Sequence, residues 1–112
     1  MDQSQYQNYK VELRRGTQIL IVLSQLKQQE YGYSLLQKLL DQDVVIEAGT
    51  LYPLMRRLEK QGVLESEWDT TESRPRKYYQ LSKDGYELYQ YLVDEWNAIV
   101  TEIASLTGRE PK

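Results

Sequence analysis

A long amphipathic segment near the end of the chain places the strongest limit on its fold. Residues 82–106 contain no proline, and their apolar side chains recur at alternating spacings of three and four. This spacing is the a/d seam of a coiled coil, and it is formed by Tyr89, Leu92, Trp96, Ile99, Ile103 and Leu106. A helix of about 24 residues is roughly 36 Å long, more than the small domain beside it can cover. We therefore expect a homodimer in which this helix packs on its two-fold mate.

A second amphipathic helix is predicted over residues 47–61. Its inward face is apolar and consists of Leu51, Leu54, Met55 and Leu58. Its opposite face is polar and consists of Tyr52, Arg56 and Lys60, flanked by Thr50 and Arg57. Pro53 follows the expected helix start, where its missing N–H costs little, and Gly62 supplies a left-handed stop. Such a segment is either an ordinary surface helix or one that enters a DNA groove.

The first part of the chain predicts two further helices. Residues 1–7 are polar and rich in glutamine, so we expect them to be frayed. Residues 8–27 carry a broad apolar face and predict the first helix. Residues 31–43 predict the second, with inward positions at Leu35, Leu36, Leu39 and Leu40. Residues 44–46 form a connector or a brief strand, so the order of helices is that of a helix-turn-helix.

After Gly62 the apolar period changes from 3.6 to 2, which indicates β-strands. Residues 63–68 and 76–81 alternate in this way, and the turn-rich residues 69–75 join them into a hairpin. Three cations lie near its tip, and they are Arg74, Arg76 and Lys77. They belong either to a solvated loop or to a wing that reaches the DNA backbone while the preceding helix reads the major groove.

Together these elements predict a mainly α protein with a small β-hairpin, an α+β winged helix-turn-helix. We assign residues 1–81 to a DNA-binding domain that includes the N-terminal helix. Residues 82–112 form the C-terminal dimerisation helix, for which Ser82 is the predicted N-cap. The two parts are expected to make one compact unit.

Composition narrows the range of functions. The chain has no His and no Cys, which removes the usual general base, the commonest metal ligand and all thiolate chemistry. Glu65 and Glu67 share a strand face, and we interpret them as solvated carboxylates rather than a catalytic or metal-binding pair. We therefore expect no enzymatic activity, no metal and no cofactor. The sequence shows neither a run of 18 apolar residues nor a signal-peptide pattern, so we expect a cytoplasmic protein without membrane contact.

The net charge of −3 opposes DNA binding when it is taken over the whole chain, because phosphate contacts need cations. The charge is unevenly distributed, however. Residues 83–112 carry three basic and six acidic side chains, so they account for the whole excess. A chain with a basic front and an acidic back can still dock on DNA.

Three stretches resemble the PadR family of bacterial transcriptional regulators. They read YGYSLLQKL, GTLYPLMRRLEKQGVLESEW and SRPRKYYQLSKDG, and the resemblance covers about residues 10–106. The single closing helix is similar to the short PadR subfamily. Many members carry glycine before the basic run of the wing, where this chain has Glu72 and Ser73. The resemblance implies a dimeric repressor of a palindromic operator, commonly one that controls its own gene together with a detoxification, efflux or stress gene.

Carried over by position, the resemblance implies three sets of contacts with double-stranded DNA. The major groove would be read by Thr50, Tyr52 and Arg56. Phosphates would be anchored by Tyr33 and Ser34, and the wing would contribute Arg74, Arg76 and Lys77. Hydroxyl groups and a guanidinium near a helix N-terminus suit phosphate oxygens and guanine edges. The alternative is a winged-helix module that docks a protein without specific DNA binding, which the isoelectric point of about 5.0 favours.

Trp96 suggests a ligand site. It lies at an a position of the seam, where indole is too bulky to pack neatly against its two-fold copy, so a gap beside it can hold a ligand between Val93 and Val100. The resemblance implies a flat aromatic or cationic effector at the dimer centre, which would relieve repression. The alternative is that Trp96 only anchors the dimer interface, which is a common role of tryptophan.

Overall fold

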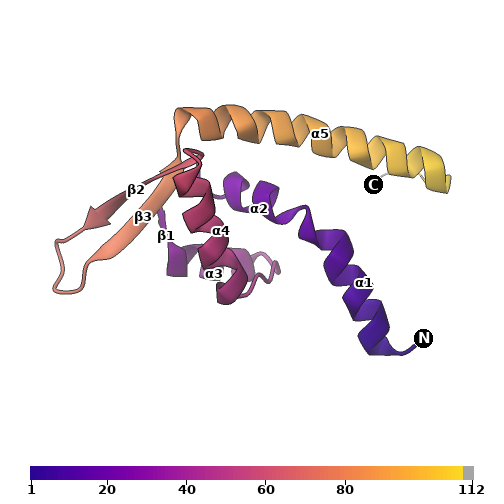
Figure 1. Cartoon of the computed structure of the whole chain (residues 1–112), viewed down its shortest axis with the longest axis horizontal. Helices are drawn as coiled ribbons and strands as arrows, with labels where there is room; N and C mark the ends of the chain where they lie inside the picture. Colours follow the sequence, from indigo (N-terminus) through magenta and orange to yellow (C-terminus); the bar gives the residue numbers. More distant parts are fainter. Residues whose placement is uncertain (110–112) are drawn as a thin grey trace.

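The computed structural model describes residues 1–109, and Figure 1 shows their arrangement. This range contains five helices and a three-stranded antiparallel sheet of order β1-β3-β2. The elements are α1 (Gln3–Arg15), α2 (Gln18–Ser24), β1 (Glu30–Tyr31), α3 (Gly32–Asp41), α4 (Ala48–Lys60), β2 (Leu64–Asp69), β3 (Arg76–Leu81) and α5 (Lys83–Thr107). The predicted α+β winged helix-turn-helix is therefore confirmed.

The N-terminal region differs from the single helix predicted over residues 8–27. It forms two helices, because the chain turns at Gly16 and Thr17, where the Thr17 hydroxyl donates to the Arg14 carbonyl at 2.7 Å. The prediction that residues 1–7 are frayed was also wrong. Asp2 caps α1 by accepting from the Gln5 amide at 3.0 Å, while the Gln5 side chain accepts from the Asp2 amide at 2.9 Å. This capping box satisfies two amides that would otherwise lack partners.

The second predicted helix is shorter than expected. Glu30 and Tyr31 form β1, which pairs with β3 at the edge of the sheet, and α3 begins only at Gly32. Leu40 was predicted to face inward but is 52% exposed, because it lies about 100° around the helix from the buried Leu39. Residues 44–46 form a connector rather than a strand, and its Ile46 is buried.

The core lies between α2, α3, α4 and the sheet. Its buried side chains are Val22, Leu23, Leu26, Leu35, Leu39, Ile46, Leu51, Met55, Leu58, Leu64, Tyr79 and Leu81. The predicted inward stripe of α4 is thus confirmed, with Leu54 half-buried beside it. Gly62 adopts a φ of 80°, which is the predicted left-handed stop. Helix α4 begins at Ala48, within the predicted bounds, but Pro53 is already its sixth residue, so it removes the bond that an N–H at position 53 would donate to the Gly49 carbonyl.

The start of α5 is fixed to the turn between α4 and β2. Ser82 is its N-cap, as predicted, because the Ser82 hydroxyl oxygen accepts from the Gly85 amide at 2.9 Å. The same hydroxyl donates to the Gly62 carbonyl at 2.6 Å. Gly85 is buried, and a Cβ at this position would lie 2.0 Å from the Val63 carbonyl oxygen. Only glycine fits here without a shift of one of the two segments.

Beyond its first turns α5 leaves the core. Leu88, Tyr89 and Leu92 still pack against the core, but the seam side chains that follow are exposed, and they are Trp96, Ile99, Ile103 and Leu106. In Figure 1, α1 and α5 extend to one side of the core and the β2–β3 hairpin extends to the other, and the long axis measures 55 Å. The radius of gyration is 16.4 Å, above the ~13 Å typical of a compact domain of about 100 residues, since these elements project. No helix in the described part of the chain is both long and apolar enough to span a membrane. The division into residues 1–81 and 82–112 stays a prediction, and residues 110–112 lie outside the described range.

Candidate nucleic-acid interface

The polar face of α4 is open on the side away from the core. Thr50, Arg56, Arg57 and Lys60 are exposed, whereas Tyr52 is half-buried. The Tyr52 ring lies across the start of α3, because a Cβ added to Gly32 would lie 2.9 Å from its Cε1 atom. Gly32 therefore allows α4 to approach the N-terminus of α3, and Tyr52 links the two helices.

The two residues predicted to anchor phosphates from α3 differ in availability. The Tyr33 side chain is 73% exposed and extends from the first turn of the helix. The Ser34 hydroxyl lies 2.8 Å from Glu30 Oε2 and 3.0 Å from the Tyr31 carbonyl. Its proton is thus directed to an internal acceptor, and a phosphate oxygen needs a donor. Ser34 would have to rotate before it could bind a phosphate.

The three wing cations have different surroundings. Arg74 is exposed in the loop between β2 and β3. Arg76 pairs with Glu72 at 2.9 Å, with both side chains at least half exposed, and its guanidinium lies 5.1 Å from the centre of the Tyr31 ring. Lys77 is half-buried and pairs with Glu59 of α4 at 2.8 Å.

A hollow of about 290 Å³ lies between the start of α3, the helix α4 and the β2–β3 hairpin, which we call the wing. It brings together residues from all three predicted sets of DNA contacts, since its lining includes Tyr33, Tyr52, Arg56, Arg76 and Lys77. Thr50, Ser34 and Arg74 lie outside this lining. Guanidinium, ammonium and phenol groups are all donors, so the hollow suits an anionic oxygen such as that of a phosphate.

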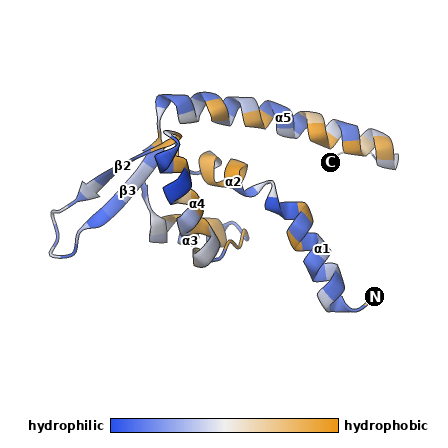
Figure 2. Cartoon of the chain, in the orientation of Figure 1, coloured by the Kyte–Doolittle hydropathy of each residue, from blue (hydrophilic) through white to orange (hydrophobic). Residues whose placement is uncertain are grey.

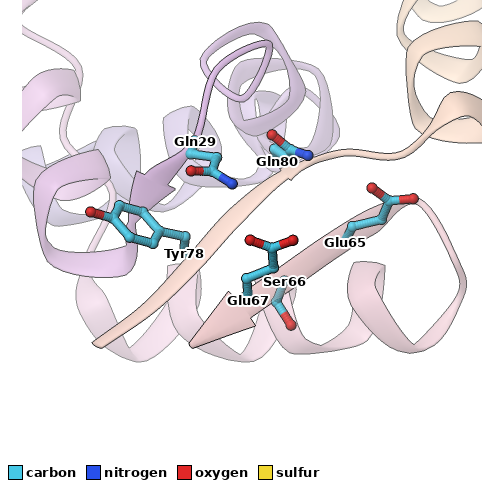
Figure 3. A pocket seen from close by; sticks show the side chains of 6 residues that line it. All are labelled: Gln29, Glu65, Ser66, Glu67, Tyr78 and Gln80. Carbon is cyan, nitrogen blue, oxygen red and sulfur yellow. The ribbon is translucent and has the colours of Figure 1, made fainter. Parts of the chain in front are cut away.

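The opposite face of the sheet has a different chemistry. It carries a second hollow of about 260 Å³, shown in Figure 3, which is lined by Gln29, Glu65, Ser66, Glu67, Tyr78 and Gln80. Glu65 pairs with Gln80 and Glu67 with Tyr78 in the β2–β3 register, so both carboxylates lie on this face, and both are exposed. Two carboxylates repel phosphate, so this face of the wing is poorly suited to contact DNA.

A cluster that the sequence did not predict holds β1 against the wing. The Tyr31 and Tyr78 rings are stacked with their centres 4.0 Å apart, and their hydroxyl groups are hydrogen-bonded. The Tyr31 hydroxyl also lies 3.1 Å from Asp69 Oδ2. These hydrogen bonds stabilise the protonated phenol and raise the pKa of Tyr31 to about 12, and the bond with Tyr78 has the largest effect. The cluster joins residues far apart in sequence, so no local pattern could have revealed it.

The fold and this surface define a winged-helix protein whose third core helix and wing share one cation-lined face, the arrangement of many transcription regulators. A comparison with protein families makes the assignment specific. Residues 19–91 match the transcriptional regulator PadR-like family, so the chain belongs to this family of transcription regulators, which are not enzymes.

Solved structures agree with this assignment. A PadR family transcriptional regulator from Eggerthella lenta is 44% identical and superposes with a TM-score of 0.88, with 93% of each chain covered. A PadR-like transcription factor from Bacteroides fragilis is 31% identical with a TM-score of 0.74, over 88% of this chain and 98% of the other. The PadR protein of Bacillus subtilis was solved in complex with operator DNA. It is 19% identical with a TM-score of 0.61 over 67% of this chain and 44% of the other, a likeness of fold alone.

Proposed function

We propose that this PadR-family regulator is a dimeric repressor. It binds a palindromic operator upstream of its own gene and of a detoxification, efflux or stress gene. The observation that carries the proposal is the hollow in which α3, the recognition helix and the wing bring Tyr33, Tyr52, Arg56 and Arg76 onto one face. The operator complex of Bacillus subtilis PadR supports it by analogy of fold.

In this proposal α4 enters the major groove and the wing follows the backbone. Thr50 in the first turn of α4 and Arg56 beyond its middle are both exposed, so they can reach base edges. Arg74 and Arg76 are exposed in the wing and can neutralise phosphates. Tyr33 can donate its phenol hydrogen to a phosphate oxygen beside them.

The test is fluorescence anisotropy of a labelled duplex from the region upstream of the gene, compared with a scrambled duplex. Arg56→Ala should weaken operator binding by ~1–3 kcal/mol if Arg56 reads a base, and it should relax the preference for operator over scrambled DNA. Arg109→Ala is the matched control, because it removes the same charge from an exposed site beyond α5. Operator binding that survives Arg56→Ala unchanged would remove Arg56 from the interface. Absence of any salt-dependent duplex binding would favour the protein-docking alternative.

We further propose that α5 forms the dimer and that a flat aromatic or cationic effector binds beside Trp96. The seam beyond the core is exposed, at 42% for Trp96, 40% for Ile99, 50% for Ile103 and 86% for Leu106. Tyr89 and Leu92 pack on the core at the near end of the seam. Val93 and Val100 are half-buried on the same helix, one turn before and after Trp96. Figure 2 shows the apolar positions recurring along α5 to its far end.

The effector proposal can be tested with a planar cationic dye whose own fluorescence reports binding. Trp96→Ala should abolish dye binding, whereas Trp68→Phe should not affect it, because Trp68 lies in the wing and is 64% exposed. Equal binding by the Trp96→Ala variant would rule out a stacking role for Trp96.

A further inference from the structure

Glu59 connects the recognition helix to both strands of the wing. It lies in the last turn of α4, and its carboxylate is half-buried. One oxygen accepts from Lys77 Nζ of β3 at 2.8 Å, and the other accepts from the Ser66 hydroxyl of β2. Figure 1 shows α4 beside the β2–β3 hairpin. A single carboxylate thus binds α4, β2 and β3 together.

Lys77 is held at this place by more than its ion pair. Its Nζ lies 5.2 Å from the centre of the Tyr79 ring and 5.9 Å from that of Trp68, which is its cross-strand neighbour. The Lys77 and Glu59 side chains are 28% and 29% exposed, so water screens the pair only in part. Hydrogen bonding between the two groups lowers the pKa of Glu59 and raises the pKa of Lys77, so both stay charged near neutral pH.

The neighbouring wing pair is different. The Arg76 and Glu72 side chains are 50% and 63% exposed. Glu72 lies in the loop between β2 and β3, and Arg76, four residues later, is the first residue of β3. An exposed pair of this kind contributes little and exchanges its partner readily. Arg76 can therefore leave Glu72 for a phosphate, whereas Lys77 would have to leave the Glu59 carboxylate and two aromatic rings.

We propose that Glu59 withholds Lys77 from DNA and clamps the wing to the recognition helix. Lys77 lines the DNA-facing hollow, yet its charge is already neutralised within the protein. The inference rests on the proposed function, and it changes one residue assignment within it, since Lys77 was predicted to contact DNA. Sequence-independent affinity comes from phosphate neutralisation, so a neutralised lysine adds nothing to it. Glu59 is a positioning residue that sets how strongly the wing attracts any polyanion.

The test compares two double substitutions that leave the net charge unchanged. One removes the half-buried pair, Glu59→Gln with Lys77→Gln, and the other removes the exposed pair, Glu72→Gln with Arg76→Gln. Binding of each protein to a random duplex is measured over ~50 to 200 mM salt, and the slope is expressed per bound protomer, where each phosphate contact contributes about 0.9. Removal of the exposed pair should lower the slope by about one, and removal of the half-buried pair should leave it as in the unmodified protein.

The single substitution Glu59→Gln frees Lys77 and should raise the slope by about one. For each bound protomer, the affinity at ~50 mM relative to ~200 mM salt then rises about 3.5-fold more than in the unmodified protein. Adding Lys77→Gln to this variant should restore the original slope. Thermal unfolding checks that each variant is folded, and the two double substitutions test the inference even if Glu59→Gln alone does not fold.

The outcomes separate this inference from the proposed function. A slope that falls by about one when the Glu59–Lys77 pair is removed would show that Lys77 contacts phosphate, and the inference would be overturned while operator binding stands. If the slopes are as expected but the protein does not prefer operator DNA over random DNA, the proposed repressor function would be overturned and the inference about Lys77 would stand. A protein that binds neither the random duplex nor heparin in a salt-dependent way would overturn both.

Discussion

Replacing Gly85 with alanine is the sharpest perturbation of the way α5 is attached. The added Cβ would lie 2.0 Å from the Val63 carbonyl oxygen and 3.0 Å from its carbonyl carbon. Backbone atoms cannot rotate away as a side chain can. Contact distances below 3.0 Å are essentially never seen for Cβ atoms, so the two segments must separate by at least 1 Å.

The size of the effect follows from where α5 is held. Its last contact with the core is Leu92, seven residues and about 10 Å further along the helix. A shift of 1 Å at Gly85, with Leu92 as the pivot, tilts the helix by about 6° and moves Leu106 by about 2 Å, because it lies roughly 21 Å beyond the pivot. The hydrogen bond that the Ser82 amide donates to the Val63 carbonyl, now 3.1 Å long, would also be strained. Overpacking of this kind costs ~1–3 kcal/mol.

The assay is urea unfolding followed by circular dichroism, with the mass of the protein in solution measured alongside it. Alanine is the better helix former by about 1 kcal/mol, so an unhindered site would gain stability, and the clash predicts the opposite sign. Gly49→Ala is the matched control, because Gly49 lies in α4 with no atom within 4 Å of the added Cβ. A Gly85→Ala variant as stable as the Gly49→Ala variant would refute the clash. An unchanged dimer mass at low protein concentration would refute the lever argument.

Three further predictions concern the seam and the two hydrogen-bonded clusters. Ile103→Ser should convert the proposed dimer into a monomer in analytical ultracentrifugation at micromolar concentration, whereas Glu102→Ser, one position off the seam, should not. The pKa of Glu59 is lowered first by the hydrogen bond from Lys77 and then by that from Ser66. The folded state therefore gains stability at pH values above the ordinary pKa of 4.5, and this stability is lost as the pH falls through the lower pKa of the folded state. Glu59→Gln should therefore flatten the acid side of the profile of urea midpoint against pH. The raised pKa of Tyr31 stabilises the fold fully below pH 10 and progressively less up to about pH 12, so Tyr31→Phe should make alkaline unfolding less steep.

The local spacing of apolar residues was enough to predict most of the helices and strands. The inward stripe of α4 and the strand over residues 76–81 both follow from spacing alone, and the structure has them at or within one residue of the predicted bounds. Ser82 and Gly62 were also identified correctly, because a cap and a left-handed stop depend on the chemistry of one residue. These features need no knowledge of distant parts of the chain.

The errors arose where tertiary contacts or short side-chain motifs decide. The two-residue strand β1 exists only because β3 lies beside it, and no pattern in Glu30 and Tyr31 signals a partner at Tyr78 and Tyr79. Helix α1 starts early because Asp2 and Gln5 form a capping box, a signal that was present but hidden in a polar stretch. The pairing of Lys77 with Glu59 spans 18 positions and depends on how the hairpin folds back on α4. The sequence therefore predicted the same role for Arg74, Arg76 and Lys77, whereas in the structure only Lys77 is half-buried and paired with α4.

The distribution of charge explains how an acidic chain can present a surface for DNA. Helix α5 carries one basic and five acidic side chains and extends away from the wing, as Figure 1 shows, whereas α4 carries three basic side chains and one acidic one. Exposed charges separated by more than about 10 Å are largely screened at ~0.1 M salt, so the far half of α5 has little effect at the wing. Within α4, the one acidic group is Glu59, which neutralises Lys77. With one cation withheld on each protomer, the wing still offers Arg74 and Arg76 to phosphates, and in the proposed complex we assign selectivity to Thr50, Tyr52 and Arg56 in the groove.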